Sequence, residues 1–196
     1  MSAAPRQVVL IITDTMGPAL LGAYRSPLGL TPSIDGFAAG AVRFEHAYTN
    51  CPLCTPARSA LYTGLPAAVN GAWSLEMPTG HTIRTVAERL DEAGIRCAHI
   101  GKWHLSATDY FDTARAPAGW EPEWWFDGRA HLESLPDGVR ERTRHVPAPG
   151  EEPVAREHTF AGGVTDRALA FLDGARGDDF FLALSYDEPH APWVWP

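Results

Sequence analysis

The sequence predicts an α/β fold with a largely parallel sheet flanked by helices. Apolar runs of strand length occur at 8–12, 95–100 and 180–185, and such runs indicate strands buried in a sheet. Helical patterns at 82–93 and 160–173 lie between them. Because strands that alternate with helices form parallel βαβ units, polar residues that follow the strands should meet at one edge of the sheet.

The first predicted strand is followed by a candidate site residue. Val8 to Ile12 is rich in β-branched residues, which predicts a strand buried on both faces. Asp14 follows at its carboxyl end, where α/β sheets build their sites, although an aspartate there more commonly caps a turn. Beyond it, the sequence predicts a short helix at 31–39 and a strand at 42–49.

The segment CPLCTPARSALYTG, residues 51–64, combines a thiol, a proline and an arginine at a predicted helix start. Pro56 is tolerated in a first helical turn, where its missing N–H breaks no bond. Arg58 lies four residues after Cys54, so both side chains share one helix face. An oxyanion at residue 54 would therefore be stabilised by the guanidinium and by the helix N-terminus.

Three interpretations of Cys51 and Cys54 remain open from spacing alone. The pair could be the CxxC of a thiol oxidoreductase, because thiol pKa values fall at helix starts. It could be half of a zinc site, but Cys97, which is the only other cysteine, is isolated in the sequence. Cys54 could also be a small buried apolar residue, which is the usual role of an unpaired cysteine.

The middle of the chain adds two candidate residues. The helix at 82–93, with Thr82 as its expected cap, leads into the strand at 95–100. Extended backbone after this strand would place Lys102 and His104 on one face. A lysine and a histidine at the carboxyl end of a strand suggest an anion site, although lone histidines often satisfy only local hydrogen bonds.

The rest of the chain supplies one more candidate and one irregular segment. His190 follows the strand at 180–185 in the sequence DEPHAPW, where a catalytic role and a role in the turn fit the pattern equally well. Residues 106–158 show no sustained period, which predicts an irregular excursion over the sheet edge. At 196 residues, the chain is expected to form one domain.

Composition and charge limit the classes of partner. The chain is 45% hydrophobic and 20% charged, as in ordinary soluble domains, and its apolar runs are too short to predict a membrane span. A net charge of −8 and scattered arginines argue against binding to nucleic acid. Three cysteines cannot all pair, and no signal-peptide pattern precedes Val8, so we expect a cytoplasmic location.

The segment CTPARSALYTG resembles the signature of the sulfatase family, within the alkaline phosphatase superfamily. The segments VVLIITDTMG, LDEAGIRCAHIGKWHL and FFLALSYDEPHAPW match the same family in order. The resemblance implies an alkaline phosphatase-like fold and hydrolysis of a small-molecule sulfate ester. It also implies that a formylglycine-generating enzyme, reading Pro56 and Arg58, converts Cys54 to formylglycine, whose hydrated aldehyde is the nucleophile.

The resemblance extends to the other candidate residues. It implies catalytic roles for Cys54, Arg58, Lys102, His104 and His190. Arg58 and Lys102 would stabilise charge, and His190 would assist the leaving group. Asp14 and the group made from Cys54 would bind a divalent metal, with calcium expected first and manganese or magnesium as alternatives.

Two features separate this chain from many sulfatases. Asp14 is followed by Thr15 instead of a second aspartate, as in the branch that contains choline sulfatases and phosphonate monoester hydrolases. A phosphonate or phosphate monoester hydrolase is therefore an alternative function. The later aspartate that completes the family's metal site has no match before Pro196. We therefore expect 1–196 to be the amino-terminal part of a sulfatase catalytic domain, apparently truncated, and an inactive fragment is a further alternative.

Overall fold

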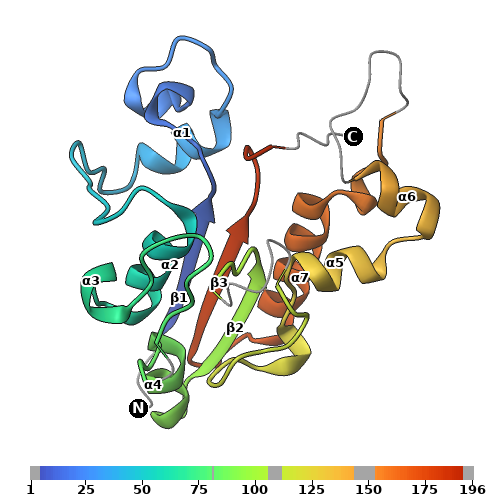
Figure 1. The fold of residues 1–196 in the computed structure, drawn as a ribbon. Helices are drawn as coiled ribbons and strands as arrows, with labels where there is room; N and C mark the ends of the chain where they lie inside the picture. The colour runs from blue at the N-terminus through green and yellow to red at the C-terminus, as the bar shows by residue number, and fades with distance from the viewer. Residues whose placement is uncertain (1–4, 81, 106–111, 144–152, 192–196) are drawn as a thin grey trace.

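A parallel sheet of three strands forms the centre of the computed structural model, which describes residues 5–80, 82–105, 112–143 and 153–191 (Figure 1). The strands are β1 (Gln7–Thr13), β2 (Arg96–Gly101) and β3 (Phe180–Tyr186). Their order is β1-β3-β2, and both pairings are parallel. The α/β class predicted from the alternation of strands and helices is confirmed.

Helices cover both faces of this sheet. They are α1 (Pro32–Ala38), α2 (Cys54–Thr63), α3 (Ala67–Asn70), α4 (Val86–Glu92), α5 (Gly128–Ser134), α6 (Asp137–Arg142) and α7 (Phe160–Gly174). On one face, Phe171 of α7 packs against Leu182 and its neighbours. On the other, Tyr62 of α2 and Ala87 of α4 pack against Phe181. The long helix expected at 160–173 is confirmed as α7.

Two expected elements differ from the structure. The strand expected at 42–49 is wrong, because this segment is irregular and its apolar side chains, such as Tyr48, are exposed without a sheet to pack on. The helix expected at 82–93 begins later than predicted, as α4. Its cap is Thr85, whose hydroxyl accepts from Glu88 N–H while the Glu88 carboxylate accepts from Thr85 N–H. Reciprocal capping fixes the helix start here.

The segment expected to be an irregular excursion is irregular at 112–121 but contains helices from Pro122 to Arg142. A 3-10 helix at Pro122–Trp124 precedes α5 and α6. Phe126 forms an isolated parallel bridge with Ile100, so the segment runs along the outer edge of β2. Parts of the expected excursion, 106–111 and 144–152, lie outside the described residues.

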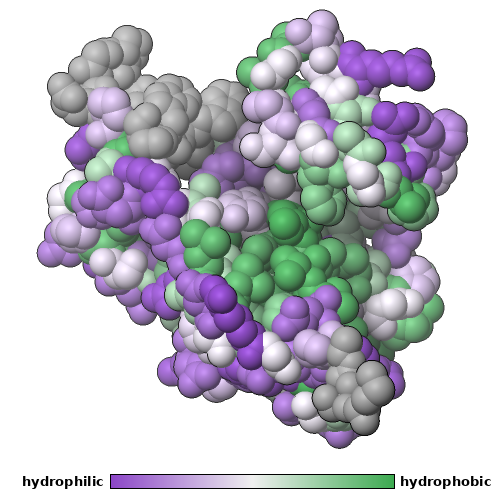
Figure 2. Space-filling view, turned by 180° about the vertical axis from the view of Figure 1, so that it is seen from behind, coloured by the Kyte–Doolittle hydropathy of each residue, from purple (hydrophilic) through white to green (hydrophobic). Residues whose placement is uncertain are grey.

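Strand β1 is exposed, so the prediction that it is buried on both faces is wrong. Val8 is 54% exposed and Ile11 is 62% exposed. Edge position alone is not the reason, because β2 is the other edge strand and is buried; α7 packs on β2 and β3 and leaves β1 uncovered. Figure 2 shows a wide apolar area on the side of the molecule that faces away from the viewer in Figure 1. Across the described ranges, no helix is both long and apolar enough to cross a bilayer.

Candidate active site

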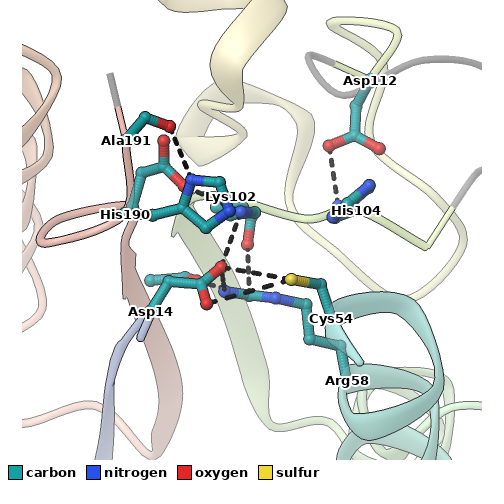
Figure 3. Close-up of polar contacts among 10 residues, drawn as sticks. Asp14, Cys54, Arg58, Lys102, His104, Asp112, His190 and Ala191 are labelled. Atoms are coloured by element: carbon teal, nitrogen blue, oxygen red, sulfur yellow. Dashed lines mark hydrogen bonds and ion pairs between the residues drawn. The ribbon is translucent and has the colours of Figure 1, made fainter. Parts of the chain in front are cut away.

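The carboxyl ends of the strands bring the predicted polar residues together (Figure 3). Asp14 follows β1 and Lys102 follows β2, and their side chains meet with Lys102 Nζ 2.6 Å from Asp14 Oδ2. Asp187 follows β3 and accepts from the same ammonium at 2.8 Å. Parallel strands end at one edge of a sheet, which is why residues so distant in sequence converge here.

Helix α2 supplies the other two members of the cluster. Cys54 is its first residue, and Cys54 Sγ lies 3.7 Å from Asp14 Oδ2. Arg58, one turn later, points to the same carboxylate with Nη2 3.4 Å from Oδ2. Residues 54 and 58 share one helix face, as expected. Both side chains therefore lie against Asp14, at the carboxyl end of β1.

The two cations set the charge state of Asp14. Partial burial alone would raise the pKa of this carboxyl, but the hydrogen bond and charge of Lys102, together with the charge of Arg58, hold its pKa below the usual value. Asp14 is therefore an anion at neutral pH. Lys102 is only 3% exposed, so this ion pair lies where water screens it weakly.

The Cys54 thiol is in an environment that does not favour the thiolate. Burial raises its pKa, and the adjacent Asp14 carboxylate raises it further, against the lowering effects of Lys102 and Arg58. All three cysteines of the sequence are unpaired. A redox dithiol at a helix start normally has a lowered thiol pKa, so this environment weighs against a thiol oxidoreductase.

Arg58 is held by acceptors that sequence reasoning missed. Its Nη1 donates to the backbone oxygen of Lys102 at 2.8 Å and to Ser185 Oγ at 2.7 Å. Ser185 is fully buried on β3. The available signal was a serine inside the apolar strand FFLALSY, because a buried hydroxyl in such a strand requires a partner.

His104 lies beside the cluster, but not in the expected extended backbone. Gly101, with φ of +121°, ends β2, and His104 itself has φ of +57°. The His104 N–H donates to Asp112 Oδ2 at 2.7 Å, a partner that the sequence did not indicate. Burial, and then the charges of Lys102 and Arg58, lower the pKa of His104 to about 4. Its imidazole is therefore neutral at pH 7.

His190 closes the site from the segment after β3. Its Nδ1 donates to the backbone oxygen of Ala191 at 2.6 Å. The other ring nitrogen, Nε2, takes no part in that hydrogen bond. His190 lines a pocket of about 530 Å³ together with Asp14, Cys54 and Arg58. The other walls are mostly apolar, and they include Ile12, Leu53, Leu61 and Leu75.

The described residues do not form a complete metal site. Asp14 offers carboxylate oxygens, yet the described chain contains no group of three or more histidine, cysteine, aspartate or glutamate side chains able to hold a metal ion. A calcium ion takes six to eight oxygen ligands, so Asp14 and a group at position 54 fit only part of its coordination shell. The nearest cation to Asp14 in the described chain is the Lys102 ammonium.

The family model described as Sulfatase matches residues 6–196, which is nearly the whole chain. The chain belongs to the sulfatase family. It is 36% identical over 194 residues to the uncharacterised sulfatase YidJ of Escherichia coli, covering 96% of this chain and 39% of the relative. It is 30% identical over 204 residues to an arylsulfatase of Hemicentrotus pulcherrimus, covering 93% of this chain and 37% of that sulfatase.

Solved structures give the same fold. The phosphonate monoester hydrolase of Agrobacterium radiobacter matches with a TM-score of 0.73 and 20% identity, over 98% of this chain and 42% of the other. A protein solved with its substrate D-glucosamine-2-N,6-O-disulfate matches with a TM-score of 0.70 and 23% identity, over 98% of this chain and 36% of the other. The expected alkaline phosphatase-like fold is thereby confirmed. This sulfatase chain spans about two fifths of the length of these relatives.

Proposed function

We propose that the protein hydrolyses sulfate esters with a formylglycine made from Cys54. The observation that carries this proposal is the position of Cys54: it opens α2 at the pocket, against Asp14 and within one helical turn of Arg58. Lys102 completes a cluster with two cations near the reacting position. Such a cluster suits a singly charged sulfate ester, whose negative charge grows during reaction and whose hydrolysis releases the doubly charged sulfate ion.

The side chains around position 54 have separable roles in this proposal. Formylglycine, as its hydrated aldehyde, supplies a hydroxyl that would attack sulfur and expel the alcohol. The second hydroxyl would then lose its proton and eject sulfate, which regenerates the aldehyde. Arg58 and Lys102 stabilise the charge on the sulfuryl oxygens. Asp14 orients the two cations through its ion pairs and accepts hydrogen bonds at the reacting group. His104, neutral at pH 7, is assigned to hold the hydrated aldehyde and to act as its base, although a pKa lowered to about 4 makes it a weak base.

His190 is placed to assist the leaving group. It lines the pocket from the segment after β3, across from α2. Because Nδ1–H donates to Ala191 O, Nε2 carries a proton only when the ring is a doubly protonated imidazolium, and in that state Nε2–H would be given to the departing ester oxygen. This assignment predicts that His190 matters most for alcohols that leave poorly as anions.

A divalent metal is part of this proposal, with Asp14 as its ligand from the described chain. Calcium is the first candidate, because Asp14 is a hard oxygen donor, and manganese or magnesium are alternatives. The donors described here are too few to hold it alone. We also propose that the substrate is a small-molecule sulfate ester and that a formylglycine-generating enzyme matures Cys54.

A phosphonate or phosphate monoester hydrolase is the second candidate. Asp14 is followed by Thr15, so the chain lacks a second carboxylate directly next to the first. The phosphonate monoester hydrolase of Agrobacterium radiobacter shares the fold. Tetrahedral anions of similar size would meet the same cations, so the cluster alone favours neither ester.

Turnover of two matched substrates tests whether the protein prefers sulfate or phosphonate esters. The protein in its natural full length, matured with the formylglycine-generating enzyme, is assayed with an aryl sulfate and with an aryl phosphonate that carry the same phenol. We expect a higher kcat/KM for the sulfate. Cys54→Ala should abolish the reaction, whereas Cys51→Ala should leave it nearly unchanged. A preference for the phosphonate would favour the second candidate, and loss of activity in Cys51→Ala would favour dithiol chemistry.

A further inference from the structure

We propose that Ser185 is a positioning residue that holds Arg58 and Lys102 in their working arrangement. Ser185 lies on the central strand β3, in register with Ile12 of β1 and with Gly101 of β2. It is fully buried, at the point where the apolar core meets the candidate site. The inference rests on the proposed function, because it assigns a supporting residue to the same reaction.

The hydroxyl of Ser185 fixes the orientation of the Arg58 guanidinium. Arg58 Nη1 donates to Ser185 Oγ at 2.7 Å and to the backbone oxygen of Lys102 at 2.8 Å. With Nη1 held by two acceptors, the planar guanidinium directs Nη2 toward Asp14, 3.4 Å away. Without the Ser185 hydroxyl, the guanidinium could rotate about its remaining contacts, and its donors would no longer be preorganised.

The backbone of Ser185 fixes the second cation. Its carbonyl oxygen accepts from the N–H of Lys102 at 2.7 Å. This contact depends on a close approach of β2 to β3, since a Cβ on Gly101 would lie only 1.9 Å from the same oxygen. Glycine also permits the φ of +121° at this position. Lys102 therefore leaves β2 at a point set by Ser185, within reach of Asp14.

The surroundings of Ser185 indicate that the role of its hydroxyl is to accept the hydrogen bond from Arg58. Side chains alternate along a strand, so Phe181 and Ala183 share its face of β3, and both belong to the apolar cluster under α2 and α4. A hydroxyl in such a position costs free energy unless it is hydrogen-bonded. The bond to a charged guanidinium offsets that cost and links the core to the site.

A double-mutant cycle on activity tests this role. The mature, full-length enzyme carrying Ser185→Ala is compared with wild type on an aryl sulfate, and the same substitution is repeated in an Arg58→Lys background. Because the maturation enzyme is expected to read Arg58, kcat of every variant is expressed per converted Cys54, with the converted fraction measured by peptide mass spectrometry. We expect Ser185→Ala to lower kcat about tenfold in the wild-type background. In the Arg58→Lys background, where the amine cannot span the same acceptors, the loss should be under about twofold. Ser59→Ala is the matched control, because Ser59 is also buried but bonds to Thr79.

The outcomes separate positioning from a merely structural role. An unchanged kcat in Ser185→Ala, or an equal loss in both backgrounds, would overturn the proposal. Should Ser185→Ala fail to fold, Ser185→Cys keeps the volume with a weaker acceptor, and it should show the same dependence on Arg58 with a smaller loss. No hydrolysis by the wild-type enzyme would overturn the proposed function itself, before any Ser185 variant is compared.

Discussion

The Lys102 ammonium lies between two carboxylates, 2.6 Å from Asp14 Oδ2 and 2.8 Å from Asp187 Oδ1. Each of these residues follows a different strand, so one cation joins the carboxyl ends of β1, β2 and β3. Lys102 is also the only lysine in the sequence. Together with Arg58, the arrangement holds two cations against two carboxylates, with the anionic Asp14 beside Cys54.

Replacing this cation should reduce the rate of reaction. We expect Lys102→Gln to lower kcat for an aryl sulfate by about a hundredfold or more, because a preorganised donor to the transition-state charge is lost. Asp187→Asn keeps the pair between Lys102 and Asp14 and should cost much less. Steady-state kinetics of the two variants check this. Equal losses would mean that Lys102 acts only through its pairing with Asp187.

Removing the His190 imidazole should affect substrates unequally. His190→Ala should slow esters of poorly leaving alcohols by about a hundredfold, because these oxygens need a proton as they depart. Esters of acidic phenols should be slowed much less. A plot of kcat/KM against the pKa of the leaving alcohol measures the difference, with the exposed His46→Ala as the control. Parallel lines for His190→Ala and wild type would remove His190 from this role.

The buried His99 should make folding sensitive to acid. Burial lowers its pKa to about 3, from the usual 6.5. Below pH 6.5 the unfolded chain binds a proton that the folded state does not bind, so the free energy of unfolding falls as pH falls. From pH 7 to pH 5, this residue alone should account for about 2 kcal/mol.

His99→Phe tests this linkage, because it removes the titrating group but keeps a ring of similar shape. The neighbours of His99 are aromatic rings, those of Tyr62, Trp103, Trp120 and Trp125. We expect a smaller difference between the urea unfolding free energies at pH 7 and pH 5 than in wild type. His46→Phe, at an exposed position, serves as the control. An identical pH dependence in His99→Phe and wild type would contradict the linkage.

The exposed strand β1 should make the chain of residues 1–196 associate. Edge strands with exposed apolar side chains pair or pack with other chains unless charges prevent it. Ile11→Lys should therefore lower the concentration-dependent increase in sedimentation coefficient. Phe37→Lys removes an even more exposed apolar side chain, on α1, and should have less effect. Equal effects of the two substitutions would indicate that association is not centred on β1.

The sequence could predict the convergence of Asp14 and Lys102, because a strand period and a parallel topology fix where strand ends lie. It could also predict the shared helix face of Cys54 and Arg58, which depends only on helical geometry. The start of α4 was available from the spacing of Thr85 and Glu88, a capping-box pattern. These features are local or follow from the order of elements.

The remaining features depend on tertiary contacts. The exposure of β1 follows from its place in the strand order and from the packing of α7 on β2 and β3, which an apolar run cannot reveal. The donors to Ser185 and Asp187 are far away in sequence, and the donor to Asp112 is His104, eight residues away with no sequence pattern that marks the pair. The backbone after Gly101 turns out of the strand because of contacts with β3, so simple alternation misplaced His104.

The state of residue 54 in the active enzyme tests the central claim most directly. The protein is produced with and without the formylglycine-generating enzyme, and peptide mass spectrometry of the fraction converted at each cysteine is compared with the aryl sulfate kcat of the same sample. We expect conversion at Cys54, none at Cys51 or Cys97, and a kcat proportional to the converted fraction. Full activity in protein whose Cys54 is entirely unmodified would contradict the account.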